Sequence, residues 1–163
     1  MKTEKTEKTN VMRVLEQHKI AYTPHTYGDG VTAVSAGEVA AALGQDPTHV
    51  FKTLVTVGKS GQHYVFVIPG PAELDLKKAA AAVGEKNIEM VKSKELLPLT
   101  GYIHGGCSPI GMKKFFTTTV DASAKDCATI CVSGGRIGFQ VEFAPADLEK
   151  VIRFAYAELT VSD

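Results

Sequence analysis

The chain has 163 residues, of which 44% are hydrophobic and 22% are charged, and its 18 lysine and arginine residues balance 18 aspartate and glutamate residues. This length suits one domain with a buried core, and zero net charge argues against a generally basic nucleic-acid binder, while leaving room for a local basic patch. No apolar run reaches the length of a membrane span, and the polar N-terminus lacks the apolar region of a secretory signal, so we expect a cytoplasmic protein.

The N-terminal residues 1–9 repeat Lys, Thr and Glu, and we expect a disordered arm followed by a single domain over 10–163. Asn10 is the candidate N-cap of a first helix. The spacing of the next apolar residues predicts one helix face, formed by Val11, Val14, Leu15 and His18.

An extended segment and a second helix come next. Pro24 keeps the segment 20–28 extended, because the residue before a proline avoids the helical region. Ser35 and Glu38 have the spacing of a capping box and predict the start of an alanine-rich helix. Gly44 predicts its end.

Two runs rich in β-branched and aromatic residues, 50–58 and 63–70, follow with a short glycine-containing link between them. This pattern predicts a β-hairpin. A third helix, 76–84, is predicted after its N-cap Asp75.

The remainder of the chain predicts further strands and two helical segments. Pro98 is expected to limit 93–101 to a brief helical turn. The last helix is expected over 144–159, with Pro145 near its start. Strands are predicted at 87–91, 114–121, 128–133 and 139–143. Helices interleaved with hairpin-linked strands indicate an α/β (α+β) domain with a mixed sheet.

The loop 105–111, "GGCSPIG", gathers glycines, a cysteine, a serine and a proline. Its glycines let the backbone pass close to a ligand, and successive amides in such loops can hold an anion or a developing oxyanion. Pro109 restricts its own φ and biases Ser108 toward extended geometry. A second glycine-rich turn, 134–138, follows Ser133, and we expect the two turns either to be plain surface turns or to face one pocket.

The three cysteines could serve thiol chemistry or plain packing. An odd number of cysteines without a secretion signal favours reduced thiols. Cys107 could be a nucleophile only with a base and a lowered pKa, so a small side chain in a turn is the simpler interpretation. Cys127 and Cys131 are spaced to share one strand face and indicate core positions, and the chain offers no convincing zinc ligand set.

Lys52 lies inside the apolar run 50–58. Strand alternation could place it in solvent, or it could present a fixed cation to an anionic ligand in a cleft.

Taken together, "VFKTLV", "GGCSPIGMKK" and "VSGGRIGFQVEFAPADL" resemble the YbaK/EbsC family, and more narrowly its Cys-tRNA(Pro) deacylases, which are related to the editing domain of prolyl-tRNA synthetases. The resemblance spans nearly the whole chain. It implies a mixed, largely antiparallel, barrel-like sheet surrounded by helices. It also implies clearance of cysteine from tRNA(Pro), with Cys-tRNA(Cys) as a further candidate, without a cofactor or metal.

The resemblance also assigns residues. Lys52 matches the family's strand lysine, Tyr27 and Ser133 match pocket residues, and Gly105 matches the glycine whose backbone contacts the substrate carbonyl region. Gln140 stands where the family often has an aspartate, which removes a charge. In the mechanism that the family implies, the substrate thiol attacks its own carbonyl, while the amides of Gly105 and Gly106 stabilise the oxyanion.

Further contacts are expected around this centre. Ser108, Pro109 and Gln140 are expected to bind the substrate, and Lys113 and Lys114 to contact tRNA, with the pairs Lys77–Lys78 and Lys92/Lys94 as other candidates. Because the net charge is zero, prolyl-tRNA synthetase is a candidate partner that would supply affinity for tRNA.

Two alternatives stay open. One is a deacylase that uses water to remove another amino acid, such as alanine or serine. The other is a non-catalytic module that binds aminoacyl-tRNA or a synthetase.

Overall fold

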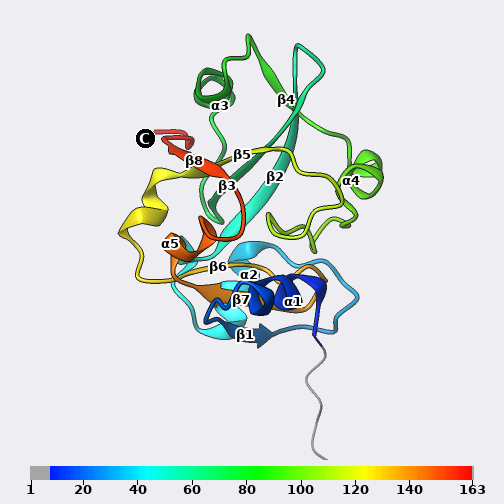
Figure 1. The fold of residues 1–163 in the computed structure, drawn as a ribbon, viewed down its shortest axis with the longest axis vertical. Coiled ribbons are helices and arrows are strands. Elements are labelled where there is room, and N and C mark those ends of the chain that lie inside the picture. Colours follow the sequence, from blue (N-terminus) through cyan, green and yellow to red (C-terminus); the bar gives the residue numbers. More distant parts are fainter. Residues whose placement is uncertain (1–7, 163) are drawn as a thin grey trace, which may run out of the picture.

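The computed structural model describes residues 8–162, whose strands form two sheets in the two halves of the molecule (Figure 1). The helices are α1 (Asn10–Gln17), α2 (Ala36–Leu43), α3 (Leu76–Val83), α4 (Ser93–Thr100) and α5 (Pro145–Leu148), with 3-10 turns η1 (Pro47–His49) and η2 (Ala122–Asp126). The strands are β1 (Thr23–Thr26), β2 (Phe51–Gly58), β3 (His63–Pro69), β4 (Ile88–Met90), β5 (Thr117–Asp121), β6 (Ile130–Ser133), β7 (Phe139–Phe143) and β8 (Phe154–Ala157).

The smaller sheet has the order β1-β7-β6 and is antiparallel, and the larger has the order β4-β2-β3-β5-β8. In the larger sheet β4, β2 and β3 are antiparallel, whereas β3, β5 and β8 run parallel. A parallel bridge between Val50 and Cys131 joins the two sheets at the start of β2. The expected mixed, largely antiparallel α/β fold is therefore confirmed, although the described strands form two sheets that do not close into a barrel.

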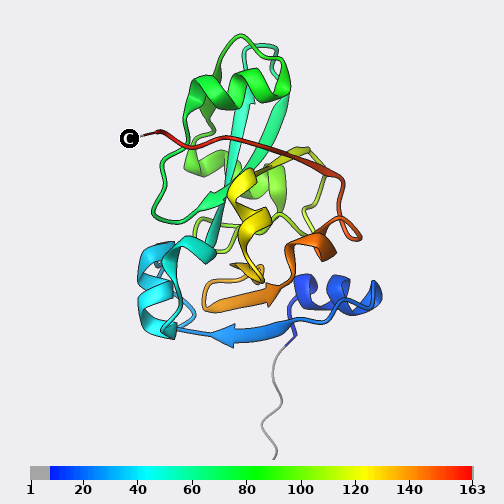
Figure 2. The same cartoon turned by 90° about the vertical axis from the view of Figure 1, so that its left-hand side faces the viewer.

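The apolar residues of both sheets meet in one main core. Phe51, Val55, Val65 and Val67 of the hairpin pack with Val132, Val141 and Phe143 of the smaller sheet and with Val11 and Leu15 of α1. A second cluster places the other face of β3 under α3. In the turned view, α1 and α2 lie at the two ends of β1 (Figure 2). Within residues 8–162, no helix is long and apolar enough to span a bilayer.

Several helix boundaries follow the local signals. The capping box of Ser35 and Glu38 is present, and Gly44 ends α2 in the left-handed region. Asp75 caps α3 by accepting hydrogen bonds from the amides of Lys77 and Lys78. The β2–β3 hairpin is also confirmed.

The N-terminal segment differs from expectation at its end. Residues 1–7 of the expected arm lie outside the described residues. Thr9, rather than Asn10, caps α1, because its buried hydroxyl accepts the Met12 amide at 3.2 Å.

Two other expectations were wrong. Pro98 lies inside α4 rather than limiting it, since one missing backbone donor is tolerated in a short, mostly exposed helix that Gly101 ends. The expected helix over 144–159 is helical only in α5. Its second half forms β8, which pairs with the edge of β5 and places Tyr156 opposite Val120. Strand pairing at an open sheet edge outweighs the helical periodicity of this segment.

Candidate active site

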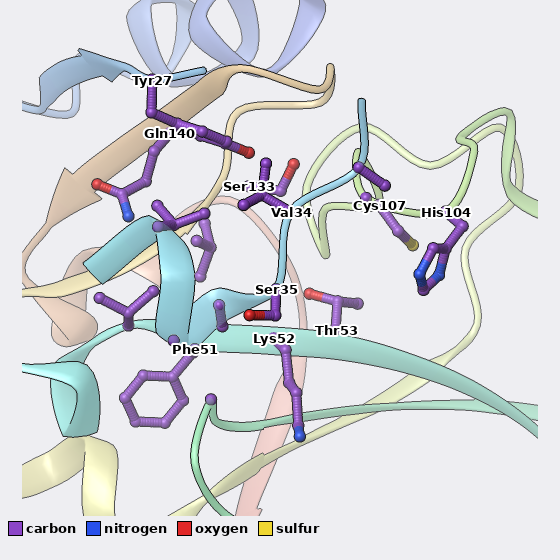
Figure 3. A pocket seen from close by; sticks show the side chains of 18 of the residues that line it. Tyr27, Val34, Ser35, Phe51, Lys52, Thr53, His104, Cys107, Ser133 and Gln140 are labelled. Atoms are coloured by element: carbon purple, nitrogen blue, oxygen red, sulfur yellow. The ribbon is translucent and has the colours of Figure 1, made fainter. Parts of the chain in front are cut away.

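A pocket of about 600 Å³ opens where the two sheets meet (Figure 3). Four parts of the chain line it: the first half of β2, the segment leading into α2, the loop before residue 108, and the adjoining ends of β6 and β7. Of the residues that the sequence singled out, it collects Tyr27, Lys52, Gly105, Ser133 and Gln140. Segments far apart in the sequence therefore converge on one cavity of a size suited to a small ligand.

Gly105 supplies backbone to the pocket wall. Its φ of +90° lies in a region that favours glycine, and a Cβ added there would lie 2.8 Å from the Cβ of Ala33. Within residues 8–162, the amides of Gly105 and Cys107 have no hydrogen-bond partner. Amides of this kind next to a cavity can donate to an oxyanion.

Gly106 does not serve as expected. Its amide donates to the Ile103 carbonyl at 2.9 Å, so it is not free for an oxyanion. A Cβ at Gly106 would meet the backbone of Arg136 at 3.2 Å. The glycine instead allows the two glycine-rich turns to pack closely together.

Ser108 and Pro109 are also placed differently from expectation. Both are buried and neither lines the pocket. The Ser108 hydroxyl accepts the Ile110 amide at 3.3 Å and so stabilises the loop itself. The serine and proline fix the shape of the loop while Gly105 and Cys107 face the cavity.

Ser133 and Tyr27 line the pocket as expected. The Ser133 hydroxyl accepts the Gly135 amide at 3.1 Å, which leaves its own O–H free to donate to a ligand. The Tyr27 amide donates to the Gly138 carbonyl at 2.9 Å, which fixes the tyrosine beside the second glycine-rich turn.

Gln140 lines the pocket, but its amide group is already engaged. It accepts a hydrogen bond from the Gln45 side chain at 2.7 Å and donates one back at 3.0 Å. The side chain is 2% exposed. Direct substrate binding, which the sequence predicted for Gln140, would have to use the one remaining N–H and lone pair.

Lys52 lines the pocket from β2, yet its ammonium is directed away from Tyr27, Ser133 and Cys107 (Figure 3). Burial lowers the pKa of this lysine, and the charge of Glu73 partly opposes the shift. Because its ammonium is directed outward, Lys52 places its charge at the edge of the cavity and not at its centre (Figure 3).

Thr53 is a pocket residue that our sequence analysis missed. It lines the cavity, and its hydroxyl oxygen is buried without any hydrogen-bond partner among the described residues. An unpaired buried hydroxyl is costly, so this group calls for an explanation. The available signal was its position next to Lys52 in a strand, where alternation turns it to the opposite face.

The thiols are not activated. Burial raises the pKa of Cys107 to about 12, so its thiol is protonated at neutral pH. Cys131 is buried on β6, as expected, and burial also raises its pKa to about 12. Cys127 lies at the end of η2 rather than on a strand. In the part of the chain that the structure describes, no group of His, Cys, Asp and Glu could hold a metal ion.

The candidate tRNA-binding lysines lie outside the pocket lining. Lys113 and Lys114 are exposed on the segment before β5. The Lys78 ammonium donates to the Thr160 carbonyl at 2.8 Å and to the Ser162 hydroxyl at 2.9 Å, so it fixes the C-terminal segment.

Comparison with known proteins identifies the family. Residues 31–151, which include every pocket residue described above except Tyr27, match the family described as "Aminoacyl-tRNA editing domain". The chain belongs to the aminoacyl-tRNA editing domain family.

Other proteins are similar to this chain over different lengths. The chain is 46% identical to "Putative Cys-tRNA(Pro)/Cys-tRNA(Cys) deacylase EbsC" of Enterococcus faecalis over 96% of each protein. It is 29% identical to a proline–tRNA ligase of Pelobacter propionicus over 60% of this chain and 17% of the ligase. A crystal structure described as "a putative trans-editing enzyme for prolyl tRNA synthetase" is 26% identical, with a TM-score of 0.79 over 93% of this chain and 95% of that one. The editing domain thus occurs both alone and within larger ligases.

Proposed function

We propose that this editing domain is a trans-acting deacylase that removes cysteine from mischarged tRNA(Pro), and also acts on Cys-tRNA(Cys). The main support is the relative named for both substrates, which is 46% identical over 96% of the chain. The pocket adds physical support, because it combines unpaired main-chain donors with a cation at its edge.

The bond to be broken is an ester between cysteine and the terminal ribose. The described pocket offers no activated nucleophile, since the pKa of the Cys107 thiol is raised to about 12 by burial. We therefore infer that the substrate sulfur attacks its own carbonyl carbon. A carbon–sulfur bond forms, the ester carbon–oxygen bond breaks, and the ribose oxygen takes up the proton that the thiol has lost.

In this scheme the protein orients the reacting groups and stabilises charge. The Gly105 amide, with that of Cys107, donates to the carbonyl oxygen as negative charge develops on it. Removal of one such donor typically slows an enzyme by about 100- to 1,000-fold. Formation of a strained thiolactone ring also depends on holding the thiol close to the carbonyl.

Thr53 and Lys52 take separate roles. The Thr53 hydroxyl is buried without a partner among the described residues, and it hydrogen-bonds the cysteinyl group once the side chain rotates toward the cavity. Lys52 lies at the edge of the cavity with its ammonium turned outward, so it contacts a phosphate or ribose oxygen of the terminal adenosine. Tyr27 and Ser133 complete the wall around the amino acid.

The reaction itself supplies specificity. Proline and cysteine are similar in size, so a synthetase pocket separates them poorly, and a second site corrects the error. Proline has no thiol and therefore cannot cyclise. Serine fits the same space, but its hydroxyl is a weaker nucleophile at neutral pH.

Prolyl-tRNA synthetase is the partner that we propose. The chain has a formal net charge of zero, which favours weak binding to tRNA alone. Relatives of this domain also occur within proline–tRNA ligases, where the domain shares a polypeptide with the synthetase. Binding to the synthetase would restore a high local concentration of tRNA(Pro).

A panel of mischarged tRNAs tests the proposed function. tRNA(Pro) carrying cysteine, alanine, serine or proline is incubated with the protein, and the remaining ester is measured over time. We expect rapid loss of cysteine alone. Preferred loss of alanine or serine would establish a water-dependent deacylase instead, and binding without ester cleavage would establish a non-catalytic module.

A further inference from the structure

A pair of glutamine side chains joins the end of α2 to β7 beside the pocket. Gln45 donates to Gln140 at 2.7 Å and Gln140 donates back at 3.0 Å, so each amide serves the other as donor and acceptor. Gln140 is 2% exposed and Gln45 is partly buried. Figure 3 shows the Gln140 amide directed away from Cys107 and His104, on the far side of the cavity from the glycine loop.

The helix that this pair holds forms one wall of the pocket. Ser35, Ala36, Gly37 and Val39, at the start of α2, all line the cavity. The opposite end of the helix finishes at Gly44, directly before Gln45. Because α2 is a rigid helix of two turns, a displacement at Gln45 also displaces the pocket-lining residues at the start of the helix.

Besides the buried Val39, several contacts of α2 are made by small side chains. Ala36 and Ala40 pack with Val50 and Cys131 in a small cluster. Gly70 allows a close approach, because a Cβ added there would lie 2.5 Å from the Cβ of Ala36. Since the alanine contacts bury little area, the directional amide pair adds a specific constraint on where the helix lies.

We propose that Gln45 and Gln140 are a positioning pair that fixes α2 against β7 and so sets the width of the substrate pocket. The inference rests on the proposed function in one respect, because the pocket is taken to accept the cysteinyl group. It assigns Gln140 to a supporting role through Gln45 and not to direct contact with the substrate.

The pair makes a specific chemical demand that glutamate can meet only when protonated. A protonated carboxyl offers one donor and one acceptor, as the amide does, whereas a carboxylate offers acceptors alone. In Gln140→Glu or Gln45→Glu, the ionised side chain would face the partner's carbonyl oxygen without a proton between them. The pair would then form at low pH and separate as the pH rises.

Other titratable groups lie close by and are common to every variant. His25 of β1 pairs with Gln140 of β7, and Glu142 follows Gln140 on the same face of β7. The side chains of His25 and Glu142 form a hydrogen bond of 2.8 Å. Asp46, next to Gln45, accepts from Thr48, and His49 lies 3.8 Å from Asp46. Dividing each variant rate by the wild-type rate at the same pH removes their contribution.

The experiment compares kcat/KM on Cys-tRNA(Pro) for Gln140→Glu, Gln45→Glu and the matched control Gln17→Glu, which changes an exposed glutamine of α1. For both pocket variants we expect the rate relative to wild type to fall about 10-fold or more between about pH 5 and about pH 8, because burial raises a carboxyl pKa into this range. We expect the rate of the control Gln17→Glu relative to wild type to stay constant over this pH range. A flat ratio for either pocket variant would overturn the proposal.

A second readout does not depend on activity. In Gln45→Met we expect the backbone amide NMR signals of Gly37 and Val39 to shift, because the wall moves, while Gln17→Met leaves them in place. A double-mutant cycle of Gln45→Met and Gln140→Met should show a coupling of about 10-fold in the folding equilibrium. Unmoved NMR signals in Gln45→Met, or additive effects of the two substitutions on the folding equilibrium, would overturn the proposed pairing. Inactivity of the wild type with these couplings intact would instead reject the proposed function alone.

Discussion

Gly105 packs directly against Ala33, so closely that a Cβ added to the glycine would lie 2.8 Å from the Cβ of the alanine. This contact joins the glycine-rich loop to the segment that leads into α2. The φ of Gly105 is +90°, so both its conformation and its neighbour exclude a side chain. The Gly105 amide therefore sits at a fixed place in the pocket wall.

Gly105→Ala is expected to displace this amide. We expect kcat/KM on Cys-tRNA(Pro) to fall by about 100-fold, the typical effect of losing an oxyanion donor. The free energy of unfolding should fall by about 1–2 kcal/mol because the backbone is strained. Steady-state kinetics and urea unfolding measure the two effects, and Gly61→Ala, in the β2–β3 turn with φ of +91° and open space around it, is the matched control. Equal losses of activity in both variants would contradict the role of Gly105.

Thr53→Val should separate activity from stability. Valine keeps the shape but removes a buried hydroxyl that has no partner among the described residues, so we expect the free energy of unfolding to rise by about 1 kcal/mol. Activity should fall by about 10-fold, because the substrate loses one hydrogen bond.

Thr56→Val is the control for Thr53. Its hydroxyl donates to the Tyr64 carbonyl at 2.9 Å within the same strand pair, away from the pocket lining. We expect this variant to lose about 1 kcal/mol of stability and to keep its activity. If Thr53→Val instead lost stability and kept full activity, its hydroxyl would have no role in substrate binding.

Lys52→Met removes the cation while keeping most of the apolar stem. We expect kcat/KM to fall about 10- to 100-fold, the range for a hydrogen bond to a charged group. Lys59→Met, on the exposed β2–β3 turn, should keep full activity. Full activity of Lys52→Met would remove this lysine from the site.

Stability should respond differently at Lys52. Burial lowers the pKa of this lysine, so its charged form is disfavoured in the folded state. Lys52→Met should therefore unfold with the same or a higher free energy than wild type at neutral pH, and the difference should fade as the pH rises from the lowered pKa of the folded state to the ordinary lysine pKa of the unfolded state. Thermal unfolding across this pH range measures the effect. A loss of stability at neutral pH would show that the charge is favourably paired.

Cys107→Ala should keep most of the wild-type rate. Burial raises the pKa of this thiol to about 12, so it is neither a nucleophile nor a base at neutral pH. Single-turnover deacylation of Cys-tRNA(Pro) provides the measurement. A collapse of the rate to the uncatalysed background, with the fold intact by circular dichroism, would point to an enzyme thiol.

Local signals were sufficient for much of the fold. The capping box of Ser35, the Asp75 cap and the β2–β3 hairpin depend on nearby residues, and each is found where the sequence predicts it. The segment 144–159 is not one helix, although its periodicity is compatible with one. Its strand, β8, forms only because β5 offers an open edge, and that edge is a property of the assembled sheet.

The site shows the same division. The resemblance named Lys52, Tyr27, Gly105 and Ser133, and all line one cavity. The sequence could not reveal that the Gly106 amide donates to the Ile103 carbonyl, because this hydrogen bond depends on how the turn folds. Nor could it pair Gln45 with Gln140 across 95 residues. Such details arise from tertiary contacts and not from local pattern.

The substrate thiol is the group on which the proposed chemistry depends, and blocking it is the most direct test. Purified protein is mixed with Cys-tRNA(Pro) and, separately, with the same tRNA carrying S-methylcysteine, and both ester loss and released products are followed. We predict rapid deacylation of the free thiol with cysteine thiolactone as the first product, and no turnover of the methylated substrate. Equal turnover of the two esters would contradict the mechanism.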